Sequence, residues 1–279
     1  MAENQKGPPP PPTDRDIASR SGIPLQRYLA HLVRETFKHG QQLWRVEAEE
    51  LPAGETFLDM LLSEISVPPA VRLAVEVKRF VHSKEDRPMR LVFLAPPNDS
   101  RAMNAPAIFC YVDPERRGKH AGQPHYLLAG SSYYAPAPEE CPVAEHCVPE
   151  ERSGNVTMDD IARDLLQQMQ ALSTARAGTQ RFTIVPVVVT NAELRLLRIG
   201  RVDLLRGIPE TGKDDGEVVK WLRYEKTLST TGLDPMKDDQ PKDFAGWAAD
   251  RLRTVFVVQA QHFIEFLRKF GVARHPWQS

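Results

Sequence analysis

The sequence predicts an α/β fold in which a mixed central β-sheet is flanked by helices. An amphipathic segment at 24–39 is followed by several short runs with the alternation of β-strands. The run 182–190 is almost entirely apolar, as expected for a strand that is buried on both faces of a sheet. Near the end of the chain, a short strand at 253–258 leads into a further helical pattern.

Composition sets the limits of the fold. The chain has 279 residues, of which 41% are hydrophobic, so it can build a substantial core. Residues 1–20 contain the five consecutive prolines Pro8 to Pro12, which predict a disordered, proline-rich tail. We expect residues 21–279 to form a single domain. The formal net charge of −1 provides no global basic field, so any contact with nucleic acid would need a local patch.

Cysteine usage favours a reduced, cytoplasmic protein, because the chain has three cysteines and no apolar signal segment. No apolar run approaches the roughly 20 residues of a membrane span, so we expect no membrane partner. Cys141, His146 and Cys147 are residue types that bind zinc, with Cys110 as a distant further ligand. Their spacing is not a usual zinc spacing, and a loop with free thiols is the favoured interpretation.

The first helix is expected over 24–39. Pro24 suits a first helical turn, apolar residues then recur at helical spacing, and Gly40 ends the pattern. Breaks that contain proline or glycine separate the strand candidates that follow, which are 43–49, 56–62, 72–80 and 89–94.

Residues 95–156 are rich in proline, glycine, serine and charge, and we interpret them as an insertion or an elaborated edge of the sheet. They contain strand candidates at 107–112 and 125–129. A second helix is expected over 157–173, with Thr157 as its N-cap. The later strands are expected at 182–190, 194–199, 218–228 and 253–258, and a helix closes the chain.

The run 73–80 is the most informative strand candidate. Its alternation places Glu76 and Lys78 side by side on one face of a mostly apolar strand. Asp59 lies on the preceding strand candidate, so a second acid could stand beside this pair. A carboxylate and an ammonium so placed form either an ion pair on a solvated strand face or the core of a metal-dependent hydrolytic site.

This constellation resembles the PD-(D/E)XK nuclease superfamily, the fold of many restriction endonucleases. The core of that family is a helix, an antiparallel three-stranded meander with an acid and then acid-x-Lys, a second helix and a further central strand. Here Asp59 would be the first acid and Glu76-Val77-Lys78 the acid-x-Lys element. The resemblance covers roughly residues 24–200.

The chain departs from the family pattern in three places. Leu58 stands where the motif has a proline before Asp59. Residues 95–156 separate the Lys78 strand from the second helix by more than the minimal core does. The segment after residue 200 has no counterpart in that core. The resemblance therefore implies a restriction endonuclease-like core with an insertion and a C-terminal strand–helix extension.

The resemblance implies a metal-dependent nuclease that hydrolyses phosphodiester bonds of DNA, with restriction or anti-phage defence as its expected role. Its catalytic residues would be Asp59, Glu76 and Lys78. Mg²⁺ (or Mn²⁺) would be held by Asp59, Glu76 and the main-chain carbonyl of Val77, because a hard dication takes oxygen ligands. Lys78 would orient the attacking water or neutralise charge in the transition state.

Further polar residues are candidates, each with a simpler alternative. Glu35 on the first helix could add a metal ligand, and Glu64 or Glu55 could take the place of Asp59. Gln167 and Gln168 on the second helix could face the same cleft, or could be ordinary surface residues. Four arginines after the buried strand could contact phosphates or be solvated charges: Arg195, Arg198, Arg201 and Arg206.

Two other functions stay open. The chain could be a catalytically inactive nuclease-like fold that binds nucleic acid or assembles with proteins, with its acids kept for structure. It could instead be an interaction protein that recruits partners through the proline-rich tail. For the nuclease, the expected partners are DNA and a protein such as a helicase or another defence component.

Overall fold

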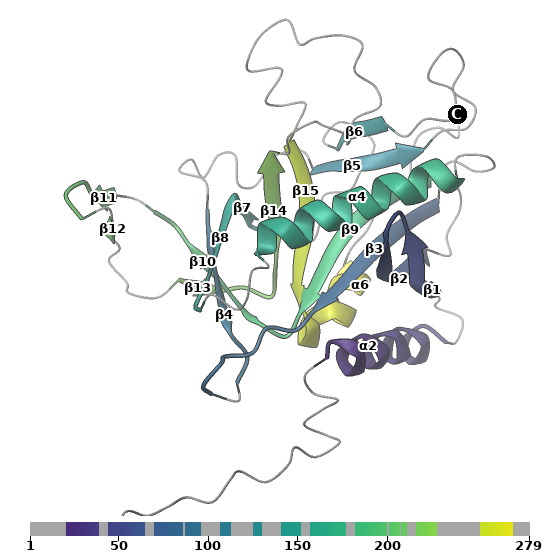
Figure 1. The fold of residues 1–279 in the computed structure, drawn as a ribbon, viewed down its shortest axis with the longest axis horizontal. Helices are drawn as coiled ribbons and strands as arrows, with labels where there is room; N and C mark the ends of the chain where they lie inside the picture. Colours follow the sequence, from purple (N-terminus) through teal and green to yellow (C-terminus); the bar gives the residue numbers. More distant parts are fainter. Residues whose placement is uncertain are drawn as a thin grey trace, which may run out of the picture.

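The computed structural model describes residues 21–38, 44–64, 70–85, 87–95, 107–112, 125–129, 141–151, 157–176, 182–199, 201–206, 208–210, 216–227 and 252–269. These residues form an α/β fold with mixed sheets of parallel and antiparallel strands flanked by few helices (Figure 1). The predicted α/β class and mixed central sheet are confirmed. The proline-rich tail, residues 1–20, lies outside the described residues.

The central sheet has nine strands in the described part of the chain, in the order β1-β2-β3-β9-β15-β14-β7, with β5 and β6 attached beside β9. In chain order they are β1 (Trp44–Ala53), β2 (Thr56–Glu64), β3 (Ala70–Lys78), β5 (Ala107–Val112), β6 (His125–Ala129), β7 (Val143–Ala144), β9 (Phe182–Thr190), β14 (Trp221–Thr227) and β15 (Leu252–Gln259). The first three strands form an antiparallel meander, whereas β3, β9 and β15 run parallel.

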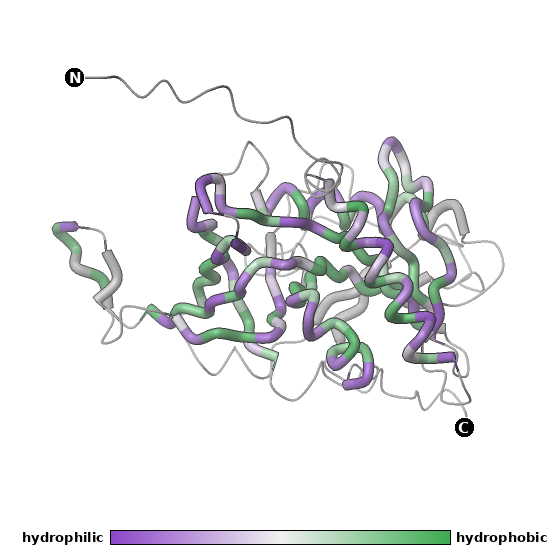
Figure 2. The backbone as a smooth tube through the Cα atoms, turned by 90° about the horizontal axis from the view of Figure 1, so that it is seen from below, coloured by the Kyte–Doolittle hydropathy of each residue, from purple (hydrophilic) through white to green (hydrophobic). Residues whose placement is uncertain are grey.

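A second, four-stranded sheet has the order β13-β10-β4-β8. Its strands are β4 (Arg90–Leu94), β8 (His146–Pro149), β10 (Glu193–Leu197) and β13 (Glu217–Val218). A hairpin of β11 (Arg201–Asp203) and β12 (Ile208–Glu210) follows β10 and projects from the body in both views (Figures 1 and 2). The sequence patterns indicated β4 and β10, but neither β8, nor the β11–β12 hairpin, nor a second sheet.

Three helices cover the central sheet in the described part of the chain: α2 (Ile23–Thr36), α4 (Met158–Arg176) and α6 (Phe263–Lys269), the last preceded by the short 3-10 helix η1 (Ala260–His262). The predicted cap of α4 is present. The N–H of Asp160 donates to Thr157 Oγ1 at 3.2 Å, and the N–H of Thr157 donates to Asp160 Oδ2 at 3.0 Å. No helix in the described ranges is both long and apolar enough to cross a lipid bilayer.

The alternation along β3 divides the core into two layers. Ala74 and Phe80 pack in the layer beneath α4, whereas Leu73, Val75 and Val77 pack in the layer beneath α2 and α6. Successive side chains of a strand point to opposite faces, so an apolar strand with helices on both sides fills both layers. The predicted facing of this strand is confirmed.

One predicted strand is wrong. The expected strand 218–228 is two strands, because β13 ends at Val218 and β14 begins at Trp221. Between them the N–H of Val219 donates to Leu194 of the second sheet, and the carbonyl of Lys220 accepts from Gln259 of the central sheet. These two residues therefore carry the chain from one sheet to the other.

The stretch 95–156, where it is described, adds strands to both sheets. Strands β5 and β6 extend from β9, β7 pairs with β14, and β8 pairs with β4 of the second sheet. The segment after residue 200 likewise supplies β14 and β15 to the central sheet. Both regions that the family resemblance left without a counterpart are thus built into the sheets.

Candidate functional site

Asp59 and Glu76 meet across the antiparallel strands β2 and β3. The register pairs Met60 with Val75, and one further step of the same register sets Asp59 opposite Glu76. Residues that face each other in an antiparallel pair have their side chains on the same face of the sheet. Ala74, two residues before Glu76, packs beneath α4, so Glu76 leaves the strand on the α4 side.

Lys78 follows Glu76 on the same face of β3. Its Nζ lies 2.5 Å from Oε1 of Glu76, and the side chains are 38% and 10% exposed, respectively. The ion pair therefore has a buried carboxylate and an ammonium that solvent, or a bound substrate, can reach.

The side chain and the main chain of Asp59 are both fixed by hydrogen bonds. The N–H of Val77 donates to Asp59 Oδ2 at 2.7 Å, and Nε2 of the buried Gln26 on α2 donates to the Asp59 carbonyl at 3.0 Å. In an antiparallel ladder the N–H and C=O of one residue point to the same side, so the Val77 carbonyl is directed toward the strand of Asp59. A Cβ on Gly22 would lie 3.7 Å from that carbonyl oxygen, so α2 begins beside it.

Both carboxyls lie where their charge is disfavoured. Burial raises the pKa of Glu76, and the neighbouring Asp59 raises it further, against the opposing effects of Lys78 and the Asp59 main chain. Burial also raises the pKa of Asp59, against the hydrogen bond from Val77 and the charge of Lys78. One ammonium therefore does not offset the burial of two neighbouring carboxylates.

Oε2 of Glu76 is buried and has no hydrogen-bond partner among the described residues. A buried polar oxygen without a donor is costly and rare in folded proteins. A divalent cation would supply the missing partner, and the available ligands are hard oxygens: the carboxylates of Asp59 and Glu76 and the carbonyl of Val77. The residues present therefore fit the Mg²⁺ that the sequence led us to expect.

The fit is limited to two carboxylates. In the described ranges, no group of three or more His, Cys, Asp and Glu side chains could hold a metal ion. Mg²⁺ is usually bound through one or two carboxylates and keeps several waters, so two acids and a carbonyl are an adequate set for it, but not for a closed structural site.

The alternative acids lie elsewhere. Glu35 is exposed near the end of α2 and pairs with Lys38. It lies thirteen residues beyond Gly22, or about 20 Å along the helix. Glu55 lies in the exposed turn before β2, and Glu64 lies five residues beyond Asp59, about 17 Å along the strand. The structure therefore brings Asp59, and neither of its alternatives, to Glu76.

The two glutamines of α4 differ in environment. Gln167 is exposed, whereas Gln168 is buried and its Nε2 donates to Thr56 Oγ1 at 3.1 Å and to the Phe57 carbonyl at 3.4 Å. Gln168 thus fastens α4 to the start of β2. Its donors are used for structure, whereas its Oε1 is buried and, like Oε2 of Glu76, has no hydrogen-bond partner among the described residues.

The arginines lie on the second sheet and its hairpin. Arg195 on β10 pairs with Glu193 at 2.5 Å and donates to the Gly216 carbonyl at 3.3 Å. Arg198 and Arg206 are exposed, before and within the β11–β12 hairpin, and the side chain of Arg201 is outside the described part. None of these arginines lies on β2 or β3, the strands that carry Asp59 and Glu76.

The cysteine segment forms no zinc site in the described residues. Neither Cys141 nor Cys147 is in a disulfide within the described residues, and they pack against opposite core layers, Cys141 on the α2 and α6 side and Cys147 on the α4 side. Burial raises the pKa of the Cys141 thiol to about 12. His146 is exposed on β8, and the side chain of Cys110 lies outside the described part.

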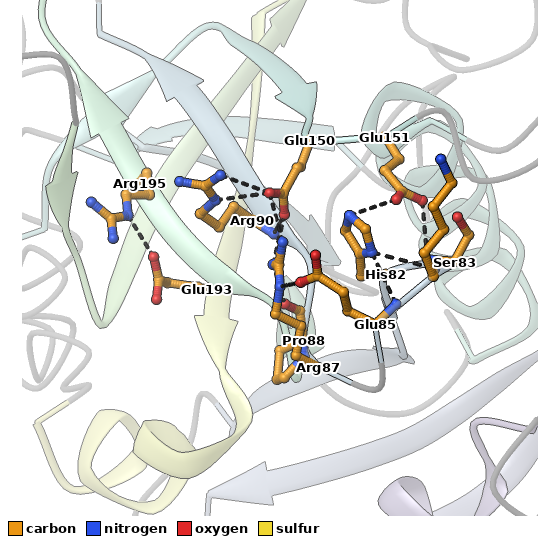
Figure 3. Close-up of polar contacts among 11 residues, drawn as sticks. His82, Ser83, Glu85, Arg87, Pro88, Arg90, Glu150, Glu151, Glu193 and Arg195 are labelled. Atoms are coloured by element: carbon orange, nitrogen blue, oxygen red, sulfur yellow. Dashed lines mark hydrogen bonds and ion pairs between the residues drawn. The ribbon is translucent and has the colours of Figure 1, made fainter.

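A second ionic cluster, which the sequence did not reveal, lies beside the second sheet (Figure 3). Glu150 accepts hydrogen bonds from Arg87 Nη1 and Nη2, both at 2.9 Å, from Arg90 Nε and Nη2 at 3.1 and 2.7 Å, and from the Arg90 main chain at 3.1 Å. These donors hold the pKa of Glu150 well below its usual range, with Arg87 the largest contributor.

The same cluster continues at His82 and Glu151. His82 Nε2 lies 2.6 Å from Glu151 Oε1, while its Nδ1 accepts from the main-chain N–H groups of Lys84 and Glu85. Glu151 also accepts from the N–H of Ser83 at 3.0 Å. Both ring nitrogens of His82 are thus engaged in holding the 82–85 loop, which leaves none for a substrate.

No protein-family model, curated protein or solved structure matches this chain. Function is therefore inferred from the residues themselves. Of the two ionic clusters, the one at Asp59 and Glu76 has a buried acceptor with no donor, whereas Glu150 is fully supplied with donors.

Proposed function

We propose that this protein is a metal-dependent nuclease that hydrolyses phosphodiester bonds of DNA and is built on a restriction endonuclease-like core. The observation that carries the proposal is the pair of carboxylates on neighbouring strands, the half-buried Asp59 and the buried Glu76, with Lys78 beside them and Oε2 of Glu76 without a donor among the described residues. The order of elements supports it, because α2, the meander β1 to β3, α4 and the parallel strand β9 follow one another as in the PD-(D/E)XK pattern.

Asp59, Glu76 and the Val77 carbonyl would hold Mg²⁺ or Mn²⁺. When bound, such an ion would stabilise charge on the phosphate oxygens and lower the pKa of a water molecule. Lys78, held by Glu76 but partly exposed, can donate a hydrogen bond to the attacking water or to a phosphate oxygen. The hydrogen bonds from Val77 and Gln26 keep Asp59 in place for this task.

A second candidate is a catalytically inactive relative of the nuclease fold that binds nucleic acid or assembles with proteins. The close Glu76–Lys78 ion pair favours it, because Lys78 partly neutralises the charge of Glu76 without any bound cation. Restriction or anti-phage defence, a helicase-like partner and a cytoplasmic location belong to the nuclease proposal. Recruitment through the proline-rich tail concerns residues 1–20, outside the described part.

The test compares Glu76→Gln with Lys78→Ala by calorimetric Mg²⁺ titration and plasmid cleavage. Glu76→Gln should abolish cleavage and weaken Mg²⁺ binding, because a neutral amide is a poor partner for a hard dication. Lys78→Ala should abolish cleavage but leave Mg²⁺ binding unchanged or tighter, because a repelling charge is removed. Glu35→Gln, an exposed acid on α2, is the control and should behave as wild type.

A structural ion pair gives a different result. Both substitutions would then lower the melting temperature to a similar extent, and neither would alter Mg²⁺ affinity. That outcome would reject the nuclease and leave the binding module as the better candidate.

A further inference from the structure

Strand β1 has a backbone irregularity directly opposite Asp59. Glu50 has a φ of 51°, and in the described part of the chain it is the one non-glycine residue with a positive φ. The register of β1 with β2 continues on both sides of Glu50 and sets it opposite Asp59. A left-handed backbone is unfavourable for a residue with a side chain and is unusual in the middle of a strand. Such residues are found most often at functional sites.

The alternation of side chains fails at this point in both strands. On β2, Leu58 and Leu61 both pack in the core layer beneath α4, although residues three positions apart on a regular strand point to opposite faces. On β1, Ala48 and Leu51 break the alternation in the same way. The side chains of the β1–β2 hairpin therefore change face where Glu50 lies.

The ion pairs of α2 show the same change of face. Glu49 and Glu50 are consecutive, yet both pair with Arg27, Glu49 Oε2 with Nη1 at 3.2 Å and Glu50 Oε1 with Nη2 at 3.0 Å. Consecutive residues of a regular strand point to opposite faces of the sheet, so only one of them would reach this helix. The left-handed backbone of Glu50 brings both to α2.

Asp59 lies where β2 changes face, and its carboxylate is tilted toward β3. It accepts the N–H of Val77 at 2.7 Å, a donor that would otherwise be available to the main chain of β2. The pairing of β2 with β3 accordingly ends at Met60 and Val75, one step before Asp59. Strand irregularities of this kind redirect a side chain or end a ladder, and they are frequent beside active sites.

We propose that Glu50 is a positioning residue for the candidate metal site: its left-handed backbone turns the β1–β2 hairpin so that the Asp59 carboxylate reaches β3 beside Glu76. The inference rests on the proposed nuclease function and deepens it, because it names the residue that sets the first acid in place. The property that matters is the φ of Glu50 and not its side chain. Glycine adopts a positive φ freely and asparagine often, whereas a β-branched residue is a severe outlier there.

The test compares variants that are all neutral at this position. Burial is the largest cause that raises the pKa of Asp59, but the charge of Glu50 raises it too, so the charge must be held constant. Glu50→Gln is the reference, Glu50→Gly and Glu50→Asn favour the positive φ, and Glu50→Ile opposes it. Calorimetric titration measures the Mg²⁺ affinity. Amide hydrogen exchange in EDTA reports whether the Val77 N–H still has its acceptor.

Relative to Glu50→Gln, Glu50→Ile should bind Mg²⁺ about tenfold more weakly and exchange the Val77 N–H about tenfold faster. Glu50→Gly and Glu50→Asn should equal or exceed the reference in Mg²⁺ affinity and in protection of Val77. Glu49 supplies the matched control, since it pairs with the same arginine and has no positive φ. Glu49→Ile should therefore match Glu49→Gln in both measurements.

The role of Glu50 is overturned if Glu50→Ile keeps the Mg²⁺ affinity and the Val77 exchange of the reference, even with a lower melting temperature. It is also overturned if Glu50→Gly loses the protection of Val77, because the side chain would then position Asp59. Should Glu50→Ile fail to fold, Glu50→Ala takes its place, since alanine lacks the same side-chain atoms but tolerates a positive φ less well than glycine. Equal Val77 exchange in the alanine and glycine variants would reject the role.

The two proposals fail in different ways. Absence of Mg²⁺ binding in wild type would reject the metal-dependent nuclease. The exchange of the Val77 N–H is measured without metal, so it would still decide whether Glu50 positions Asp59.

Discussion

Glu76 and Glu150 are both partly or fully buried glutamates next to cations, but their surroundings differ. Glu150 is met by two arginines and a main-chain N–H, so both of its oxygens have donors. Glu76 has Lys78 and the Asp59 main chain as partners, its Oε2 has no donor among the described residues, and it stands beside the carboxylate of Asp59. Accordingly the pKa of Glu150 is lowered and the pKa of Glu76 is raised.

The difference separates a structural ionic cluster from a candidate reactive one. The Arg87 and Arg90 guanidinium groups stabilise the charge of Glu150 and join the loop before β4 to the end of β8. At Glu76 the fold keeps a charge that its surroundings do not offset. Stability that is given up in this way is typical of sites prepared for a ligand.

The largest expected effect is on catalysis. Glu76→Gln should reduce plasmid cleavage by at least about 10²-fold, because a neutral amide holds Mg²⁺ poorly and the cation would stabilise the charge that develops in the transition state. Glu150→Gln should leave cleavage per folded molecule unchanged, since Glu150 belongs to the second ionic cluster. Comparable losses in both variants, measured as kcat on one plasmid substrate, would show that the two clusters do not differ in function.

The second expected effect is on stability, where Glu150→Gln should be the more harmful of the two substitutions. Glu150→Gln should lower the free energy of unfolding by about 1–2 kcal/mol, because it weakens several charge-assisted hydrogen bonds that solvent partly screens. Glu76→Gln should not lower it, because it removes a buried charge with a raised pKa. Urea denaturation in EDTA measures both values, and a clear loss of stability in Glu76→Gln would mark its ion pair with Lys78 as structural.

The sequence predicted individual strands well and their neighbours poorly. The runs 107–112, 125–129 and 182–190 coincide with β5, β6 and β9 at both ends, because each is an apolar run with polar or turn-forming flanks. An apolar pattern shows that a strand is buried but not which strand it pairs with. The sequence therefore could not show that β4 and β10 pair with each other in a second sheet and not with strands of the central one.

The same distinction applies to the candidate site. The nearness of Glu76 and Lys78 follows from alternation within one strand, so the sequence was sufficient. The choice of Asp59 depended on the register between two strands, which the sequence left open. The contacts of Glu150 with Arg87 and Arg90 join residues 63 and 60 positions apart, and no local pattern indicates them.

A smaller effect is expected at Gln26, which ties α2 to the candidate site. Gln26→Leu should remove the hydrogen bond to the Asp59 carbonyl and lower the free energy of unfolding by about 1 kcal/mol. Because Asp59 would be less well fixed, Mg²⁺ affinity should also fall. Gln167→Leu, on the exposed side of α4, is the control. A loss of stability with unchanged Mg²⁺ affinity would show that Gln26 only packs the helix.

The smallest effect is on the pH dependence of stability without metal. The pKa values of Asp59 and Glu76 are raised in the folded state, so the folded protein binds more protons than the unfolded chain between their ordinary and raised values. Stability from these groups should therefore rise as the pH falls from neutral toward about 4.5. The pKa of Glu150 is lowered, so its contribution is present above its ordinary value and is lost as the pH falls below it.

The two glutamates should therefore affect different pH ranges of the free energy of unfolding. In urea denaturation at a series of pH values in EDTA, Glu76→Gln should flatten the rise between neutral and mildly acidic pH. Glu150→Gln should instead flatten the loss at lower pH and leave that rise intact. Because Mg²⁺ would favour the ionised carboxylates, adding it should raise stability most at neutral pH in wild type and have little effect in Glu76→Gln. If the wild-type free energy of unfolding instead falls steadily as the pH drops from neutral, and Mg²⁺ has no effect, then the charge of Glu76 is stabilised by its surroundings as that of Glu150 is. Glu76 would then not be a metal ligand.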